Sequence, residues 1–444
     1  MKLAIIVSHP IQYYVPVFQR MAKEIHLKVF YTTNRNNSFD EGFNKTVVWD
    51  IPLLIGYDHE FVSYKNIVKA ITNYGPSSLL IYGWAHAAHL IILYYFKGLV
   101  QLTFRGDSTL LNKKCGFRNS FKTLALKYIY SRIDIAFYVG SQNRLYYLKY
   151  GLKEHQLTFA PHSVDNGLFE TEKTHRECIY QQYDKSTSSN NATDENFVDT
   201  TVTTNATSFL SNLTDENFVI TTLTIDATSS ISNNATDENF VDTILTSNTT
   251  VFPNARVTDP PNSFKKRLGI PAHDLVILYA GKLDKNKNPT LLLKAFKELE
   301  LKNVHLVIAG SGILQEYFEH NSQHHHYIHY LPFQNQSKMP ALYQICDLFC
   351  LPTQSDSWGL SINEAMAAGK AILVSDKAGA AFDLVKAANG KVFESNNLID
   401  LKVKLKELLS NGRFLKEAGR CSEEIIKNWT IEIQVKNIIK CLDK

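Results

Sequence analysis

Residues 348–375 read LFCLPTQSDSWGLSINEAMAAGKAILVS. Two apolar runs, LFCLP at 348–352 and AILVS at 371–375, have the composition of buried strands. The loop between them carries Asp356 and Glu364, and a Gly-Leu-Ser turn at 359–361 opens a helix of small residues. Strand, loop, helix and strand in this order indicate a parallel α/β sheet. The amides at the start of the helix suit a phosphate, and the two acids could hold sugar hydroxyls beside it.

The same alternation of apolar strands and helices extends over both halves of the chain. It predicts an α/β protein with two doubly wound, Rossmann-like parallel sheets. The expected strands are residues 3–8, 27–32, 78–83, 99–104, 135–140 and 157–161 in the first half, and 275–281, 305–310, 329–333, 347–352, 371–375 and 391–394 in the second.

Residues 186–262 interrupt this pattern. They are rich in Asn, Thr and Ser, carry ten acidic residues and one Arg, and repeat NATDENFVDT imperfectly three times. Such a composition buries little apolar surface, which favours a disordered or weakly β insert over a small solenoid. The predicted domains are therefore residues 1–185, the insert at 186–262, residues 263–428, and a C-terminal helix at 429–444.

Composition limits the remaining classes of protein. The chain has 444 residues, 44% of them hydrophobic, and a net charge of +4, which is ordinary for two or three globular domains. The N-terminal apolar run is too short for a signal peptide, and the run at 88–100 is broken by Lys97 and Gly98, so no transmembrane helix is expected. Six cysteines without a C-x-x-C pair favour free buried thiols in a reducing cytoplasm.

A basic, amphipathic stretch lies near residues 113–132. Two interpretations remain open: a helix that rests on an anionic membrane surface, or a solvated helix face. No nucleic-acid-binding motif accompanies these charges, and the sequence does not indicate such a partner. The cations are Lys113, Lys114, Arg118, Lys122, Lys127 and Arg132.

Three further loops follow strands of the second half, where open α/β sheets bind ligands. The first begins at Gly281 and carries Lys282 and Lys287, which could form a diphosphate cradle or lie at the surface. The second, AGSG at 309–312, contains Gly310 and Gly312, which permit close backbone approach or only a turn. The third offers Phe333 and Gln334, which could meet a nucleobase, although Phe333 could equally be a core residue.

Taken in order, these four loops resemble the C-terminal domain of the retaining glycosyltransferases of family 4, also called glycosyl transferases group 1. The resemblance covers about residues 264–444 and implies the GT-B fold, two Rossmann-like domains that face a cleft, with the helix at 429–444 crossing back to the first domain. It implies that Lys282 and Lys287 bind the diphosphate of the donor, that Glu364 binds ribose, and that Asp356 contacts the donor sugar. Lys282 stands where the family has Arg, and Asp356 where it has Glu. The donor-binding residues so implied are Gly281, Gly310, Gly312, Phe333, Gln334, Gly359, Leu360, Ser361 and Glu364.

The first half is similar to bacterial members of this family that begin with an HPIQYY motif, here at residues 9–14. Many members have a His near the donor sugar at the end of a strand, and Arg105 occupies that place. Arg105 is therefore grouped with Lys282, Lys287 and Asp356 as catalytic, while His9 and Asp107 are expected to contact acceptor or sugar.

The resemblance implies a hexosyltransferase-like enzyme (EC 2.4) that moves a sugar, with retention, from a nucleotide-diphospho-sugar to a glycan or lipid-linked acceptor in polysaccharide or glycoconjugate synthesis. It implies no cofactor and no metal. The expected location is the cytoplasm, with peripheral contact at the inner face of the plasma membrane through residues 113–132. A nucleotide-sugar epimerase of the same fold and a non-catalytic sugar-nucleotide-binding protein remain alternatives.

Overall fold

The first strand contains LAIIV at 3–7, which is almost fully buried, and it is an inner strand of a parallel sheet. In the computed structural model, residues 1–33, 39–111, 118–170 and 261–442 are described. They belong to one compact unit, Met1–His175 with Ala255–Lys444. The predicted acidic insert lies outside the described residues, so the predicted domain boundaries stay a prediction.

The first sheet has seven strands in the order β5-β2-β1-β6-β7-β8-β9, and all its pairings are parallel. Successive strands are added on one side of β1 and then on the other side, beginning with β6. The loops after β1 and β6 therefore diverge at a topological switch point, where ligands commonly bind. The strands are β1 (Lys2–Val7), β2 (His26–Tyr31), β5 (Asp58–Phe61), β6 (Ser78–Tyr82), β7 (Gln101–Arg105), β8 (Ile135–Tyr138) and β9 (Leu157–Phe159).

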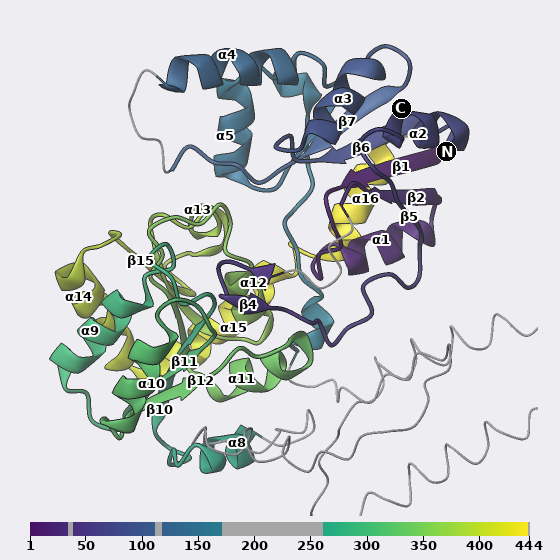
Figure 1. Cartoon of the computed structure of the whole chain (residues 1–444). Coiled ribbons are helices and arrows are strands. Elements are labelled where there is room, and N and C mark those ends of the chain that lie inside the picture. Colours follow the sequence, from purple (N-terminus) through teal and green to yellow (C-terminus); the bar gives the residue numbers. More distant parts are fainter. Residues whose placement is uncertain (34–38, 112–117, 171–260, 443–444) are drawn as a thin grey trace, which may run out of the picture. The chain divides into compact units, whose positions relative to one another are not determined.

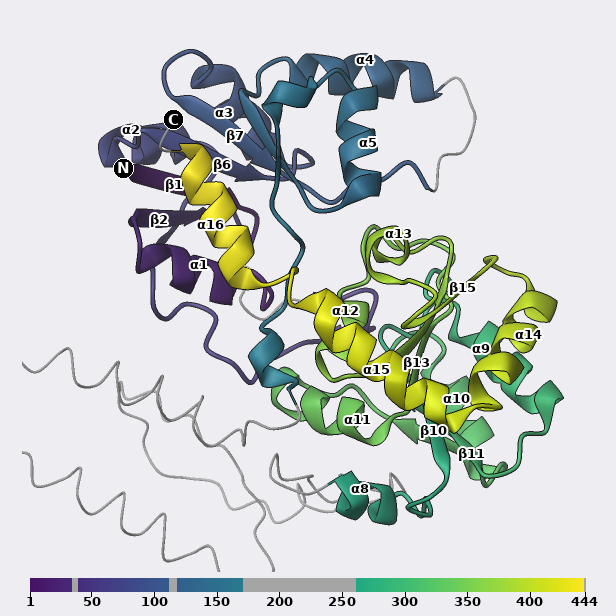
Figure 2. The same cartoon turned by 180° about the vertical axis from the view of Figure 1, so that it is seen from behind.

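Two layers of helices cover this sheet. Four helices pack on one face through one apolar cluster, and α1 and α16 pack on the other face through a second cluster. Figure 2 shows α16, the last helix of the chain, beside α1 on the first sheet. The helices are α1 (Val15–Ala22), α2 (Ile67–Tyr74), α3 (Ala87–Tyr95), α4 (Arg118–Tyr130), α5 (Ser141–Lys149) and α16 (Ile431–Leu442).

The second sheet repeats the same topology with six parallel strands in the order β12-β11-β10-β13-β14-β15. Figure 1 labels β10, β11, β12 and β15 of this sheet. Its switch point lies between β10 and β13. The carboxyl ends of these two strands lead into the lysine loop and the acidic loop that the sequence singles out. The strands are β10 (Leu275–Ala280), β11 (Val304–Ala309), β12 (Ile328–Leu331), β13 (Leu348–Leu351), β14 (Ala371–Ser375) and β15 (Gly390–Phe393).

Helices enclose the second sheet with an apolar core of its own. α9 packs against α14, and α12 packs against α15. The helices are α8 (Pro261–Arg267), α9 (Pro289–Leu299), α10 (Gln315–Gln323), α11 (Met339–Ile345), α12 (Leu360–Ala367), α13 (Ala380–Leu384), α14 (Leu398–Leu409) and α15 (Gly412–Ile426). Among the described residues, no helix has the length and apolar character needed to cross a membrane.

The prediction of two Rossmann-like sheets is confirmed, with shifts of one or two residues at several strand ends. Two features of the first half are not predicted. Strand β5 reads Asp-His-Glu-Phe, a polar sequence at the sheet edge. β3 (Phe39–Asp40) and β4 (Lys45–Thr46) form a short antiparallel hairpin apart from both sheets. We call residues 39–50, which contain this hairpin, the strap.

Candidate functional site

A pocket of about 430 Å³ opens where the loops after β1 and β7 meet the loops after β10, β11, β12 and β13. This volume is within the range of small-molecule sites. Most of the residues predicted from the sequence line it. They are His9, Asp107, Gly281, Lys282, Lys287, Gly310, Phe333, Gln334, Asp356, Gly359, Leu360, Ser361 and Glu364.

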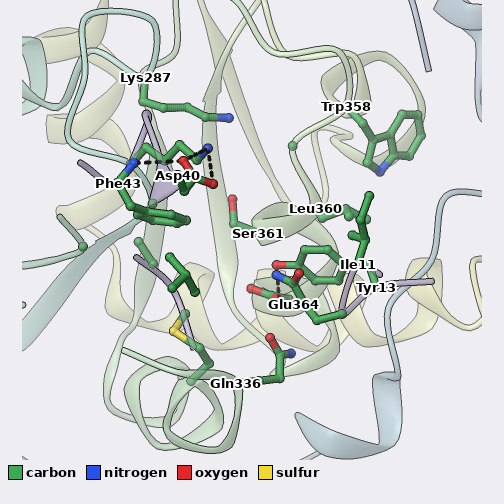
Figure 3. A pocket seen from close by; sticks show the side chains of 18 of the residues that line it. Ile11, Tyr13, Asp40, Phe43, Lys287, Gln336, Trp358, Leu360, Ser361 and Glu364 are labelled. Atoms are coloured by element: carbon green, nitrogen blue, oxygen red, sulfur yellow. Dashed lines mark hydrogen bonds and ion pairs between the residues drawn. The ribbon is translucent and has the colours of Figure 1, made fainter. Parts of the chain in front are cut away.

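Glu364 is buried on α12 and lies between two tyrosines. Its carboxylate accepts one hydrogen bond from the Tyr13 hydroxyl at 3.0 Å and another from the Tyr343 hydroxyl at 2.7 Å. Figure 3 shows Tyr13 beside Glu364. Burial raises the pKa of Glu364 to about 7, although bonds from Tyr343, Tyr13 and Gln336 act in the opposite direction. Glu364 therefore changes charge near neutral pH. Tyr13 belongs to the loop after β1, so residues 351 positions apart meet at this carboxylate.

Asp356 forms an ion pair with Lys287 at the mouth of the lysine loop. The carboxylate also accepts a bond from the backbone amide of Trp358 at 3.3 Å. Both ion-pair partners are largely shielded from solvent and both line the pocket. The pair therefore places one cation and one acid next to each other at the switch point of the second sheet.

Lys282 is bound by the strap. Its ammonium group donates to both carboxylate oxygens of Asp40, at 2.8 and 3.1 Å. Burial acts to raise the pKa of Asp40, but the bonds from Lys282 and from the amides of Phe43 and Gly42 outweigh it, so that pKa is lowered. Figure 3 shows Asp40 and Phe43 across the pocket from Tyr13 and Glu364.

The N-terminus of α12 faces the pocket. Gly359 precedes the helix in a left-handed conformation, with φ at 94°, which favours glycine. Leu360 and Ser361, the first two helical residues, line the pocket. Amides of a first turn have no partner within their helix, so this end can bind an anion.

Gly310 and Gly312 serve the packing of neighbouring loops. A Cβ atom on Gly310 would lie 1.9 Å from the carbonyl oxygen of Gly281, and one on Gly312 would lie 2.5 Å from that of Leu283. The loops after β10 and β11 therefore pack backbone against backbone. Gly310 lines the pocket, whereas Gly312 is not among its lining residues.

An aromatic cluster closes one end of the pocket. Phe333 makes edge contacts with Phe43 and Trp49 of the strap, with ring centroids 4.9 and 5.9 Å apart. The ammonium group of Lys45 lies 4.5 Å from the centre of the Phe333 ring. Gln334 also lines this end. The strap thus supplies two of the three aromatic rings in this cluster, Phe43 and Trp49.

On the opposite side, the first sheet contributes polar groups. Asp107 accepts a 2.6 Å bond from the hydroxyl of Ser357, and His9 contacts the Ser8 hydroxyl at 2.9 Å. His162 also lines the pocket. Burial, and then the charge of Arg105, lower the pKa of His162 to about 3, so its ring is neutral at neutral pH.

Arg105 is placed differently from the expectation that it contacts sugar. It is buried, it is not among the lining residues, and its guanidinium donates to the carbonyl oxygens of Ala160 and Pro161 at 2.8 and 2.9 Å. Arg105 therefore supports the backbone just before His162 from behind.

Several lining residues are missed by the sequence reasoning. Tyr13 lies in the quoted HPIQYY motif, so the motif itself could have pointed to it. The strap residues carry no strand or helix periodicity, and nothing local marks them. The missed residues include Tyr13, Asp40, Phe43, Trp49, His162, Gln336, Tyr343 and Trp358.

Within the residues that the structure describes, no group of three or more His, Cys, Asp or Glu side chains could hold a metal ion. The absence of a metal requirement stays a prediction.

Comparison with known proteins points to one family for the second half. The family model described as Glycosyl transferases group 1 matches residues 262–428. A D-inositol 3-phosphate glycosyltransferase of Corynebacterium diphtheriae is 23% identical over 177 residues, which are 37% of this chain and 42% of that protein. A lipopolysaccharide 1,2-N-acetylglucosaminetransferase of Salmonella typhimurium is 31% identical over 134 residues, 27% of this chain and 35% of that protein. The chain spans less than half the length of these relatives.

Solved structures resemble the whole chain in fold. Anabaena Alr3699/HepE, crystallised with UDP and glucose, has a TM-score of 0.62 at 11% identity and is covered completely, as is this chain. A glycosyltransferase from Rickettsia africae has a TM-score of 0.64 at 11% identity, with 100% of this chain and 98% of that one covered. The chain thus has the two-sheet GT-B fold, and its residues 262–428 match the model of the glycosyl transferases group 1 family.

Proposed function

We propose that this protein is a glycosyltransferase that moves a sugar from a nucleotide-diphospho-sugar to an acceptor. The observation that carries the proposal is the convergence of two lysines, a helix N-terminus and a buried carboxylate on one pocket: Lys282, Lys287, the start of α12, and Glu364. Such a set matches the charge pattern of a donor, with an anionic diphosphate beside a ribose. The matching family model covers the same loops.

In this proposal the second half binds the donor. Lys282, Lys287 and the amides of Leu360 and Ser361 bind the diphosphate, and Glu364 accepts hydrogen bonds from ribose hydroxyls. Asp356 contacts the donor sugar. Phe333 and Gln334 meet the base. Gly281, Gly310, Gly312 and Gly359 shape the loops that bring these groups together.

The first half supplies the acceptor side. His9 and Asp107 contact the acceptor or the transferred sugar from the loops after β1 and β7. His162 joins them, since its neutral ring lines the same side. Arg105 acts as a positioning residue for His162, because it binds the two carbonyl groups that precede it.

In this proposal, catalysis rests on stabilising the leaving diphosphate, and no side chain acts as a nucleophile. The lysines and the α12 amides neutralise the charge that develops as the glycosidic bond breaks. A leaving phosphate oxygen then takes the proton of the attacking acceptor hydroxyl on the same face, which retains the anomeric configuration. We propose that this requires no metal. NMR of the product anomer, with and without a chelator, tests both points.

The acceptor is a glycan or a lipid-linked saccharide in this proposal, and the cytoplasmic face of the plasma membrane is its place of action. Names of relatives support the class: one is a lipopolysaccharide N-acetylglucosaminetransferase, and another transfers to a diphospho-undecaprenol-linked sugar in Campylobacter jejuni. The solved relative with UDP and glucose supports a nucleotide sugar as donor.

The decisive experiment begins with a thermal-shift screen over nucleotide sugars, because a bound donor stabilises the folded protein by mass action. The best donor is then used in transfer assays with glycan and lipid-linked acceptors. Lys287→Ala and Glu364→Ala are expected to lower transfer at least tenfold. Lys285→Ala is the matched control, since Lys285 lies in the same loop, is exposed and does not line the pocket. Unchanged transfer in both pocket variants would refute the proposal.

The same protein and the same donor distinguish two alternative functions. An epimerase would convert the donor to a new sugar isomer without any acceptor, which product analysis of the donor alone reveals. A non-catalytic binding protein would be stabilised by donor yet show neither transfer nor hydrolysis.

A further inference from the structure

Helix α3 exposes an uncharged, apolar face to solvent. The chain from Ala87 to Tyr95 contains no charged residue, and its hydrophobic character would suit a fully buried helix. Yet only one side packs on the sheet, through Ile92 and Leu93. The opposite side is exposed, including Tyr94 at 68% of its surface, and the turn that follows exposes Leu99 at 67%. The exposed apolar residues of this side are Leu90, Ile91, Tyr94, Tyr95 and Leu99.

Arg132 joins this face to α4. Its guanidinium lies 4.8 Å from the ring centre of Tyr94 on α3 and 4.7 Å from that of Tyr128 on α4. It also donates a hydrogen bond to the Tyr128 hydroxyl at 2.5 Å. The two exposed tyrosines thus share one cation. Since α4 also exposes Leu124, at 69% of its surface, the apolar surface continues from α3 onto α4. We call Leu90, Ile91, Tyr94, Tyr95, Leu99, Leu124 and Tyr128 the α3–α4 surface.

The charge around this surface has one sign. From residue 83 to residue 133 the sole acidic residue is Asp107, and that side chain lines the pocket. Lys122 and Lys127 are exposed on α4, the helix that carries Leu124 and Tyr128. Asp134, the next acid along the chain, is engaged by Lys97 at 2.5 Å and by the amide of Leu102. An apolar, tyrosine-rich surface is therefore flanked by cations.

We propose that the α3–α4 surface docks on an anionic lipid bilayer. Tyrosines prefer the boundary between lipid tails and water, where the ring is buried and the hydroxyl stays wet. Exposed leucines enter the apolar region, while Lys122, Lys127 and Arg132 meet phosphate groups. This pairing of apolar and cationic groups fits a membrane better than a protein surface, whose contact core is depleted of lysine. The proposal does not depend on the proposed transferase activity.

The inference changes the sequence-based expectation in one respect. The sequence predicts contact through the basic stretch at 113–132 alone, whereas the apolar area that inserts belongs mainly to α3. Each cation near an anionic surface strengthens binding roughly fivefold, and two or three cations alone bind weakly. Insertion of the exposed leucine and tyrosine side chains supplies the remaining binding free energy.

Sedimentation of the full chain with vesicles tests the proposal. Binding is expected with phosphatidylcholine vesicles that contain phosphatidylglycerol, to be much weaker with pure phosphatidylcholine, and to fall as salt rises. The triple variant Tyr94→Ser/Leu99→Ser/Leu124→Ser and the charge variant Lys122→Glu/Lys127→Glu are each expected to weaken binding at least tenfold. All five side chains are exposed, so the folded state should persist, which thermal unfolding verifies.

A matched control lies on α14 and α15. The variant Ile399→Ser/Val403→Ser/Lys406→Glu/Lys416→Glu changes exposed apolar and basic residues of the second half and is expected to bind vesicles as the unaltered chain does. Equal binding of the triple variant and the unaltered chain would overturn the proposal. So would a dimer in light scattering that the triple variant converts to a monomer, because a second copy would then cover this surface.

Discussion

Asp40 binds the ammonium group of Lys282 through both carboxylate oxygens, across 242 positions of sequence. Lys282 is one of the two lysines assigned to the donor diphosphate. The carboxylate of the strap therefore stands where an anionic ligand would compete for the same cation. In the proposed function, the donor diphosphate competes with Asp40 for Lys282.

Removal of that competitor should tighten donor binding. For Asp40→Asn, which keeps the shape of the side chain, we expect the Kd for the best nucleoside diphosphate to fall about two- to fivefold, the scale of a partly exposed ion pair. Isothermal titration calorimetry measures this. Asp50→Asn is the control, because Asp50 binds Ser337 and not Lys282. Weaker binding in Asp40→Asn would mean that the strap carboxylate contributes to the donor site.

Glu364 should make the folded protein less stable as the pH rises toward neutral. Its pKa is raised from 4.5 to about 7 in the folded protein, so the folded state binds this proton more tightly than the unfolded state. The free energy of unfolding therefore falls as pH rises from about 4.5 to about 7, by on the order of 3 kcal/mol from this group alone. Urea unfolding of Glu364→Gln at several pH values should show a shallower decline than the unaltered protein.

The titration of Glu364 should also change donor affinity. Ribose hydroxyls bind a carboxylate better than a neutral acid, so donor affinity is expected to rise as pH passes about 7. In Glu364→Gln the affinity should be low and nearly independent of pH over that range. An identical pH profile in both proteins would exclude Glu364 as the titrating group.

Arg105→Met tests whether this residue positions His162. Two buried carbonyl groups lose their charged donor, and we expect a loss of about 2–3 kcal/mol in the free energy of unfolding. Burial is the larger reason for the low pKa of His162, but the charge of Arg105 adds to it. The pKa of His162 should therefore rise in the variant, as measured by NMR titration. A lost transfer rate without either change would instead favour direct contact of Arg105 with sugar.

Gly310→Ala should disrupt the lysine loop without touching a lysine. The new Cβ atom would lie 1.9 Å from the carbonyl oxygen of Gly281, and the residue has a φ of 152°. We expect a destabilisation of about 2 kcal/mol or more, with weaker donor binding. Gly412→Ala is the control, since nothing lies within 4 Å of its Cβ position, and its effect should stay within about 0.5 kcal/mol. Chemical denaturation of both variants measures the difference.

The sequence predicts the parts of this fold that depend on local pattern. Apolar strands such as LAIIV and the loop around Asp356 are recognisable because burial and turn chemistry act within a few residues. The strap is not, since Asp40 gains its role only from Lys282, far along the chain. Nor does the sequence distinguish the two sides of α3: an apolar run such as LIILYY looks equally buried all round.

The direction in which the Arg105 side chain points could not be predicted from the local sequence either. Arg105 follows the family pattern in position, at the end of β7, but its guanidinium turns to the carbonyls of Ala160 and Pro161. Which way such a side chain turns depends on partners brought by another loop, and those are visible only in three dimensions.

Helix α16 has a consequence for how the protein is made. One face of the first sheet is covered by α1 and by α16, and the latter includes Ile431, Val435 and Ile438 near the very end of the chain. A ribosome delivers residues in order, so this apolar face stays partly bare while some three hundred further residues are synthesised. The first half therefore completes its core only after residues 431–442 have been synthesised, and a nascent chain that stalls before residue 431 exposes this apolar face to chaperones and proteases.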